Sequence, residues 1–325
     1  MKNFKTYRQQ LSILRSRGLV VPKTGLPMRI LENENYYKLI NGYKDLFLDT
    51  SSHDEIYRQG TQFSEVKSLY DFDRKLRLLF LEPILMIEAK LKSSIAYEFS
   101  SENGHDNYLK NSSFNDLKQT GAKHTTLLRR TQDISELIAH VQSDISSACL
   151  RKDYVKHYLQ EYGYVPLWVL INSLSLGTVS KFYHLMKDKE RIEVAKRFFI
   201  HNNELDQAIK ILGAIRNITA HDERLYNVRL KNGYEIMDTP IHHQLSILKL
   251  NGKYIYGKND LFSVVIILKR LLSKSDFIKF YKQLKTEINA VLCQLPTISR
   301  TAFLHKLGFP QNWDIIVITN GFVEL

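Results

Sequence analysis

The chain has 325 residues and a formal net charge of +12, from 46 Lys and Arg against 34 Asp and Glu. Hydrophobic residues make up 44% and charged residues 25%, a balance that excludes a disordered chain and indicates a globular protein with a sizeable core. A surface this basic favours a polyanionic partner, most simply a nucleic acid and less simply an anionic membrane. The two cysteines, Cys149 and Cys293, lie far apart, which excludes a disulfide scaffold and a cysteine-based zinc site and fits a cytoplasmic protein.

Neither a secretory signal nor a membrane span is expected. Five Lys or Arg residues interrupt Met1–Arg17, which leaves no continuous apolar stretch there. The longest uncharged segment, Tyr162–Ser180, includes Pro166 and Asn172 and is too polar to prefer lipid. We therefore expect a buried helix in this segment and no membrane partner.

Apolar residues recur at three- and four-residue spacing through most of the chain, which predicts a mainly α-helical fold. A first short helix is expected to end at Arg17-Gly18, and a second apolar cluster ends at Asn41-Gly42. The longest periodic segment runs from Phe63 to Phe99, with a kink or a break expected at Pro83. Residues 100–126 are rich in Ser, Asn, Gly and Asp and are predicted to form a loop region.

More helices are predicted in the rest of the helical body, over Asp133–Ala148, Asp153–Glu161, Pro166–His184, Lys189–Phe199 and Glu204–Ala220. After Tyr226 the turn signals Asn232-Gly233 and Asn251-Gly252 allow a small hairpin. Helices are predicted again over Leu261–Leu272 and Ser275–Leu292. The tail, Ile315–Ile318 followed by Asn320-Gly321, allows a short strand. The economical organisation is a helical body, residues 1–230, with a smaller and mainly helical C-terminal extension, residues 231–325, packed on it.

Common metal and nucleotide motifs are absent from the sequence, which has no HExxH, P-loop, GxGxxG or paired CxxC. Asp71 precedes Lys75 by four residues, and Asp73 precedes Arg77 by four, which favours surface ion pairs over a metal site. The dipeptide His221-Asp222 resembles part of the metal site of HD phosphohydrolases, but the chain holds three such dipeptides, and one dipeptide does not make a ligand set. We expect neither a metal nor another cofactor.

The most informative segment is the end of the last predicted body helix, where Arg216 and Asn217 precede His221. An Arg and a His four to six residues apart is the active-site pattern of HEPN ribonucleases. The pairs Arg151–His157 and Arg300–His305 have similar spacing, but only Arg216 is followed by the Asn, Asp or His that the pattern favours.

The setting of these residues gives a physical argument. The predicted helix is apolar on several faces, which is typical of a buried helix, and an Arg on such a helix is costly to bury without a partner. Arg216 and Asn217 must therefore be paired internally or open onto a cleft or an interface. Asn217 and His221 share a helix face because they are four residues apart. The simpler alternative is a structural Arg–carboxylate pair with a His that satisfies carbonyls at the helix end.

Four blocks of sequence occur in an order that is found in a known family. The blocks are Tyr7-Arg8-Gln9-Gln10-Leu11 with Leu14–Leu19, then Asn35–Leu39 with Gly42-Tyr43; Leu69–Arg77 with Ile87-Glu88; Pro166–Val169 with Ser175-Leu176-Gly177; and Arg216–His221 with Arg224–Asn227. With these blocks the chain resembles the AbiD/AbiF group of bacterial abortive-infection proteins over most of residues 4–230. Asp222 stands where a second His is expected, and Tyr226 where the family often has Trp.

The resemblance implies a HEPN-like helical bundle that commonly dimerises and acts in phage defence by cleaving RNA. Some members of the group are encoded beside a structured non-coding RNA that restrains them. His221 would then be the acid–base residue, Arg216 would clamp the phosphate, and Asn217 would orient His221 or a phosphate oxygen. One such set is half a site, so a homodimer is expected. The alternative function is a non-catalytic RNA-binding or phage-sensing module with the same shape.

RNA contacts are expected from Lys and Arg side chains, because the phosphate backbone dominates affinity. The candidates are Arg74, Lys75, Arg77, Lys123, Arg129, Arg130, Arg151 and Lys152.

Overall fold

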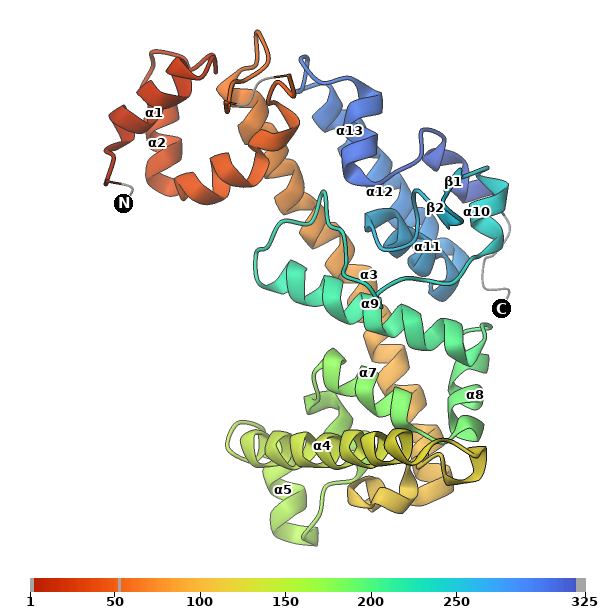
Figure 1. Ribbon diagram of the computed structural model, residues 1–325. Helices are drawn as coiled ribbons and strands as arrows, with labels where there is room; N and C mark the ends of the chain where they lie inside the picture. Colours follow the sequence, from red (N-terminus) through yellow and green to blue (C-terminus); the bar gives the residue numbers. More distant parts are fainter. Residues whose placement is uncertain (1–2, 52–53, 320–325) are drawn as a thin grey trace.

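The longest helix, α3 (Phe63–Asn103), runs through the molecule, and helices from the middle and the C-terminal part of the chain pack against it (Figure 1). The computed structural model describes residues 3–51 and 54–319 and confirms a mainly α-helical protein. The predicted break at Pro83 does not occur, because α3 continues through it. The turns on both sides are packed into the core, with Phe80 against Phe280 and Ile87 buried, so packing supports the helix where Pro83 removes a backbone donor.

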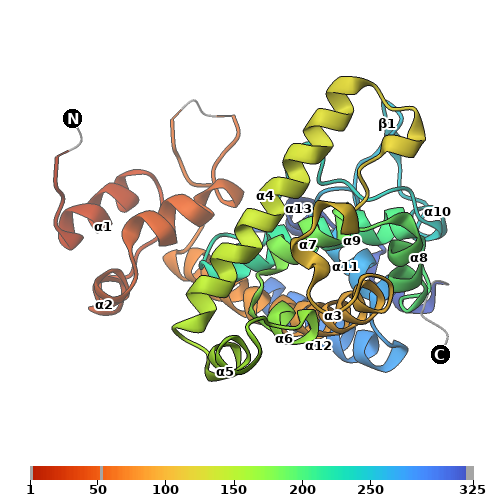
Figure 2. The same cartoon turned by 90° about the horizontal axis from the view of Figure 1, so that it is seen from below.

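The first helices lie at the N-terminal end of α3, apart from the rest of the chain in both views (Figures 1 and 2). They are α1 (Tyr7–Ser16) and α2 (Leu26–Asn33), followed by a π-helical turn, Tyr37–Asn41. Gly18 follows α1 with φ +88°, a left-handed conformation that suits the predicted stop.

Three helices pack on the C-terminal half of α3: α6 (Leu167–Leu170), α7 (Leu176–Leu185) and α8 (Asp188–Lys196). Two more, α4 (His124–Cys149) and α5 (Asp153–Tyr162), pack on α7 and α6 respectively. The predicted start of the fourth helix at Asp133 is wrong, because α4 already begins at His124. Its first two turns are mostly exposed and so lack the apolar periodicity that marks a helix in the sequence.

The single helix predicted over Pro166–His184 is also wrong. A 3₁₀ turn, Ile171–Ser173, follows α6, and the backbone is extended at Leu174. Ser175 then caps α7 by accepting a hydrogen bond from the Thr178 N–H at 3.1 Å, so the start of a new helix interrupts the apolar run. No helix in the described part of the chain has both the length and the hydropathy to cross a membrane.

The helix α9 (Asn202–Ala220) crosses α3 and packs on α7 and α8 (Figure 1). The chain after it forms α10 (Pro240–Gln244), a hairpin of β1 (Lys249–Leu250) and β2 (Lys253–Tyr254), and α11 (Leu261–Leu271), α12 (Lys274–Leu292) and α13 (Arg300–Leu307). The hairpin is antiparallel and turns at Asn251-Gly252, as the sequence allows, with positive φ at both residues.

The short strand that the sequence allows at Ile315–Ile318 does not form, because Trp313–Ile318 is a 3₁₀ helix. The buried Lys269 ammonium donates to the Thr319 carbonyl at 2.6 Å and holds this segment against α11. A side chain therefore satisfies backbone carbonyls that a strand would pair with a neighbour. The predicted turn Asn320-Gly321 lies outside the described residues.

The predicted domain boundary at residue 230 lies in the extended segment between α9 and α10. Across this boundary α12 packs along α3, with Lys75 and Glu287 joined at 2.9 Å and Lys279 and Glu82 at 3.1 Å. The buried side chains of both parts form one continuous core. The division into a body and an extension stays a prediction.

Candidate functional site

The C-terminal end of α9 carries the three residues singled out from the sequence. The helix buries Leu205, Ile209, Leu212 and Ile215 along one side, and its last turn leaves Asn217 and His221 exposed. His221 caps the helix, and its backbone N–H donates to the Asn217 carbonyl at 3.0 Å. The two side chains therefore stand one helical turn apart at the surface, on the same side of the helix end.

Arg216 is half-buried and has no ion pair among the described residues. Its Nε is shielded from solvent and has no hydrogen-bond partner in the described chain. The alternative of a structural Arg–carboxylate pair is therefore not realised in this part of the protein. A guanidinium without an internal acceptor is available for an external anion.

The turn after α9 is held to α3 by a network that we call the Asp73 clamp: Tyr43, Asp73, Arg77, Asp222 and the backbone of residues 223–226. Asp73 is fully buried and accepts from the Tyr43 hydroxyl at 2.6 Å and from the Tyr226 N–H at 2.5 Å. Arg77 lies between Asp73, at 2.7 Å, and Asp222, and donates to the Glu223 carbonyl at 3.2 Å. The clamp thus fixes the position of His221 relative to α3.

Electrostatics differ between the two carboxyl groups of the clamp. Burial raises the pKa of Asp73, while hydrogen bonds from Tyr43 and the charge of Arg77 oppose the rise. At Asp222, partial burial favours a higher pKa. A hydrogen bond from Lys38 at 2.9 Å and the charge of Arg77 outweigh this effect and hold the pKa of Asp222 below the usual range. Asp222 is therefore ionised at neutral pH, and its carboxylate is paired with the side chains of Lys38 and Arg77.

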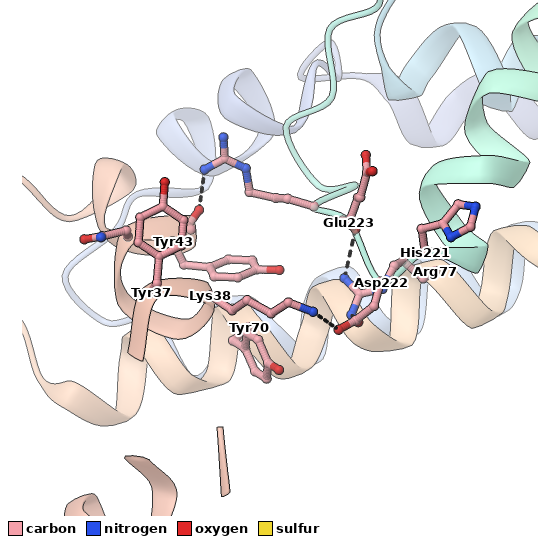
Figure 3. A pocket seen from close by; sticks show the side chains of 11 residues that line it. Tyr37, Lys38, Tyr43, Tyr70, Arg77, His221, Asp222 and Glu223 are labelled. Atoms are coloured by element: carbon pink, nitrogen blue, oxygen red, sulfur yellow. Dashed lines mark hydrogen bonds and ion pairs between the residues drawn. The ribbon is translucent and has the colours of Figure 1, made fainter. Parts of the chain in front are cut away.

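A cavity of about 350 Å³ lies beside the clamp. Figure 3 shows Tyr37 at the end opposite His221 and Asp222, with Lys38 reaching along the cavity to Asp222. The imidazole of His221 points away from the Lys38–Asp222 pair (Figure 3). The cavity is lined by Tyr37, Lys38, Asn41, Gly42, Tyr43, Tyr70, Arg77 and His221–Arg224.

A second cleft, of about 460 Å³, lies between α7 and α9 and reaches Asn217. His184 Nδ1 lies 2.8 Å from Asp206 Oδ2, and the Lys210 ammonium lies 4.7 Å from the centre of the Tyr234 ring. Asp206, Lys210, Asn217 and His221 recur at four- and seven-residue steps and so form one polar stripe on α9. This stripe is not among the residues predicted from the sequence, although it follows the same helical periodicity as the apolar face.

The structure separates the predicted RNA contacts. Arg77 is 5% exposed within the clamp, and Arg130 is 8% exposed and donates to the carbonyls of Asn115 and His184. The guanidinium groups of Arg77 and Arg130 therefore lie inside the protein, where they are hydrogen-bonded, and not on a surface that RNA could contact. Arg74 and Lys75 remain at the surface, paired with Glu34 and Glu287 respectively.

The other candidates lie on α4 and at its ends. Lys123 and Arg129 are exposed near its start, and Arg151 and Lys152 follow its end. A helix of 26 residues is about 39 Å long, so the two pairs are far apart. The described structure therefore does not gather the candidates into one patch.

The two predicted ion pairs on α3 also differ from expectation. Asp73 and Arg77 are paired, but inside the protein rather than at its surface. The pair Asp71–Lys75 is wrong, because Asp71 instead pairs with Lys67 at 2.7 Å. No group of three or more His, Cys, Asp or Glu side chains among residues 3–51 and 54–319 is arranged to hold a metal ion.

Comparison with known proteins identifies the family. A family model described as "Abi-like protein" matches residues 29–227, from within α2 to just beyond α9. This range includes all of α3 and α9, the Asp73 clamp and the three residues at the end of α9. No curated protein and no solved structure matches the chain.

Proposed function

The chain belongs to the Abi-like protein family, which suggests a part in abortive infection against phage, and we propose that it acts as a metal-independent endoribonuclease of the HEPN type. The observation that carries the proposal is the end of α9. There two exposed side chains stand beside Arg216, which has no internal partner in the described chain: His221, whose imidazole can transfer a proton, and Asn217, whose amide can donate and accept hydrogen bonds.

Cleavage needs a base, an acid and an anion clamp, and each copy of the end of α9 supplies one proton-transfer group and one clamp. His221 takes the proton of a ribose 2′-hydroxyl, and the oxygen attacks the adjacent phosphorus. The bond from phosphorus to the 5′-oxygen breaks, that oxygen takes up a proton, and a 2′,3′-cyclic phosphate remains. Arg216 stabilises the charge on the phosphate oxygens, and Asn217 orients His221 or a phosphate oxygen.

One copy of the chain presents half of this site. A two-fold homodimer would face one His221 with another, so that one imidazole removes a proton while the other supplies one. We propose this arrangement in the cytoplasm, with the target RNA and a structured non-coding guard RNA as partners. The formal charge of +12 supports a polyanionic partner of either kind.

The HD-type hydrolase interpretation has less support. In such an enzyme Asp222 would have to bind a metal, whereas here it pairs with Lys38 and Arg77. A non-catalytic RNA-binding module remains the second interpretation. It requires the same basic surface but does not need His221.

The test is cleavage of single-stranded RNA in EDTA by full-length protein stripped of co-purified nucleic acid. We expect the wild type to cleave and His221→Ala to lose at least about a hundredfold in rate, the range of general acid–base catalysis. His157→Ala is the matched control, because His157 is also exposed and follows an Arg, Arg151, by six residues. Equal activity of wild type and His221→Ala would overturn the proposal, and RNA binding without cleavage by either would favour the binding module.

A further inference from the structure

The cavity beside His221 has aromatic walls that the cleavage step does not use. Tyr37 projects from the π-helical turn and is 72% exposed. Tyr43 and Tyr70 also line the cavity, with their rings edge to face at 5.3 Å between centres. Three tyrosines around a space of about 350 Å³ suit a flat, apolar-faced group.

The cationic side chains Lys38, Arg77 and Arg224 of the cavity are already held by other groups of the protein. Lys38 and Arg77 pair with Asp222, and Arg224 donates to the Gly42 carbonyl. Among residues 3–51 and 54–319, the side-chain amide of Asn41 has no hydrogen-bond partner. The cavity therefore offers a ligand the Tyr37 ring, an amide with donors and an acceptor, and at its rim the exposed carboxylate of Glu223. The ring and the amide suit an uncharged group, and the carboxylate does not favour an anionic one.

The wall beside His221 is held rigidly. Asp222 has φ +54°, a left-handed conformation that is uncommon for a residue other than glycine. The clamp holds this turn through Arg77, and Asp73 binds the backbone N–H groups of Leu225 and Tyr226. A cavity fixed in this way loses little conformational freedom when it binds a ligand.

We propose that this cavity is a nucleobase pocket, which takes one unpaired base of a single-stranded RNA, stacked on Tyr37 and hydrogen-bonded by Asn41. The assignment rests on the proposed function, because it is the position beside His221 that makes RNA the source of the base. Bases splayed out of single strands are commonly recognised by aromatic stacking and by hydrogen bonds to their edges. The pocket would thus direct cleavage to unpaired positions next to the base that it holds.

The test measures binding, independently of cleavage. The probe is a short fluorescein-labelled single-stranded RNA whose 2′-hydroxyls are methylated, so that it is not cut by the proposed reaction. We expect Tyr37→Ala to weaken its binding to the full-length protein by roughly tenfold, because stacking on an aromatic side chain contributes on that scale. Tyr37→Phe should bind like the wild type, and Asn41→Ala should bind roughly fivefold more weakly.

Tyr97→Ala is the matched control, because Tyr97 is also an exposed tyrosine, 64% accessible, but lies on α3 outside this cavity. It should bind like the wild type. Unchanged binding by Tyr37→Ala would overturn the pocket, and so would a Tyr37→Ala protein whose only change is its oligomeric state, since the ring would then belong to an interface. Tyr37-dependent binding by a protein that does not cleave RNA would support the pocket and refute the nuclease. Cleavage with Tyr37-independent binding would do the reverse.

Discussion

Asp222 links the turn that carries His221 to two other segments of the chain. Its carboxylate pairs with Lys38 of the π-helical turn and with Arg77 of α3. The backbone of Asp222 itself is in the left-handed conformation. Asparagine tolerates this backbone conformation, so Asp222→Asn removes the charge and leaves the geometry. The substitution isolates the electrostatic contribution of the carboxylate.

We expect Asp222→Asn to lower the free energy of unfolding at pH 7 by about 1 kcal/mol, because its side chain is 48% exposed and the pair is partly screened. The pKa of Asp222 is depressed, so its contribution is fully present above the ordinary Asp pKa of about 3.9 and is lost as the pH falls through the lower folded value. Urea unfolding of both proteins should show a constant difference from about pH 7 to pH 5. A difference that disappears in this range would contradict the assigned pairing.

Asp73 is expected to matter more, because it is buried and accepts several hydrogen bonds at once. This contrast shows what the sequence does and does not reveal at the scale of residues. The four-residue spacing predicts the pair between Asp73 and Arg77. It does not predict that this pair is buried, because the segment that covers it belongs to a distant part of the sequence: Asp222 lies 145 positions after Arg77. The same limit explains why Arg77 and Arg130 were expected to bind RNA. A solvated Arg and a buried, paired Arg are alike in sequence.

At the scale of elements, Gly257 lies in the loop before α11 and joins this loop to α10 and to the start of α11. Its N–H donates to both carboxyl oxygens of Asp260, the cap of α11, at 3.0 Å, and its carbonyl lies 2.8 Å from His242 Nε2 of α10. Gly257 has φ +78°, and an added Cβ would lie 2.9 Å from Ile266 Cδ1. Both the conformation and the space therefore require glycine here.

We expect Gly257→Ala to destabilise the protein by about 2–4 kcal/mol, the sum of backbone strain and overpacking. Gly252→Ala is the control, because Gly252 has φ +79° in the hairpin turn but nothing within 4 Å of an added Cβ. It should lose only about 1 kcal/mol. Thermal or urea unfolding of the two variants measures the difference, and equal losses would show that the close contacts at Gly257 do not exist.

Periodicity predicts the elements best where a helix has one clearly buried face. The predicted Leu261–Leu272 and Ser275–Leu292 agree with α11 and α12 within one residue at each end. Prediction is weaker at the start of α4, whose turns are exposed, and at Ser175, where a cap interrupts an apolar run. The order Arg216, Asn217, His221 singles out the end of α9 in the sequence. The aromatic cavity beside it could not be predicted in this way, because its walls come from segments that are distant in the sequence.

At the scale of the whole molecule, the proposed site needs two copies of the chain. If both His221 side chains act in one composite site, a dimer with one His221→Ala subunit is inactive. When wild type and His221→Ala are unfolded and refolded together in equal amounts, about a quarter of the dimers are wild type. We expect the cleavage rate to fall to about one quarter of the rate of wild type at the same total protein concentration.

Refolding the wild type with an equal amount of His157→Ala controls for dilution and recovery, and it should leave the rate unchanged. A rate that falls only to one half with His221→Ala would mean that each chain carries a complete site. Light scattering of the same samples reports whether dimers form at all.

The most direct test of the central claim is the chemistry of the product ends. After wild-type cleavage of RNA in EDTA, mass spectrometry of the fragments should find 2′,3′-cyclic phosphate ends, and His221→Ala should form them at least about a hundredfold more slowly. Fragments with 3′-hydroxyl ends, or cleavage that requires a divalent metal, would contradict the account, because neither arises from attack by a 2′-hydroxyl that His221 activates.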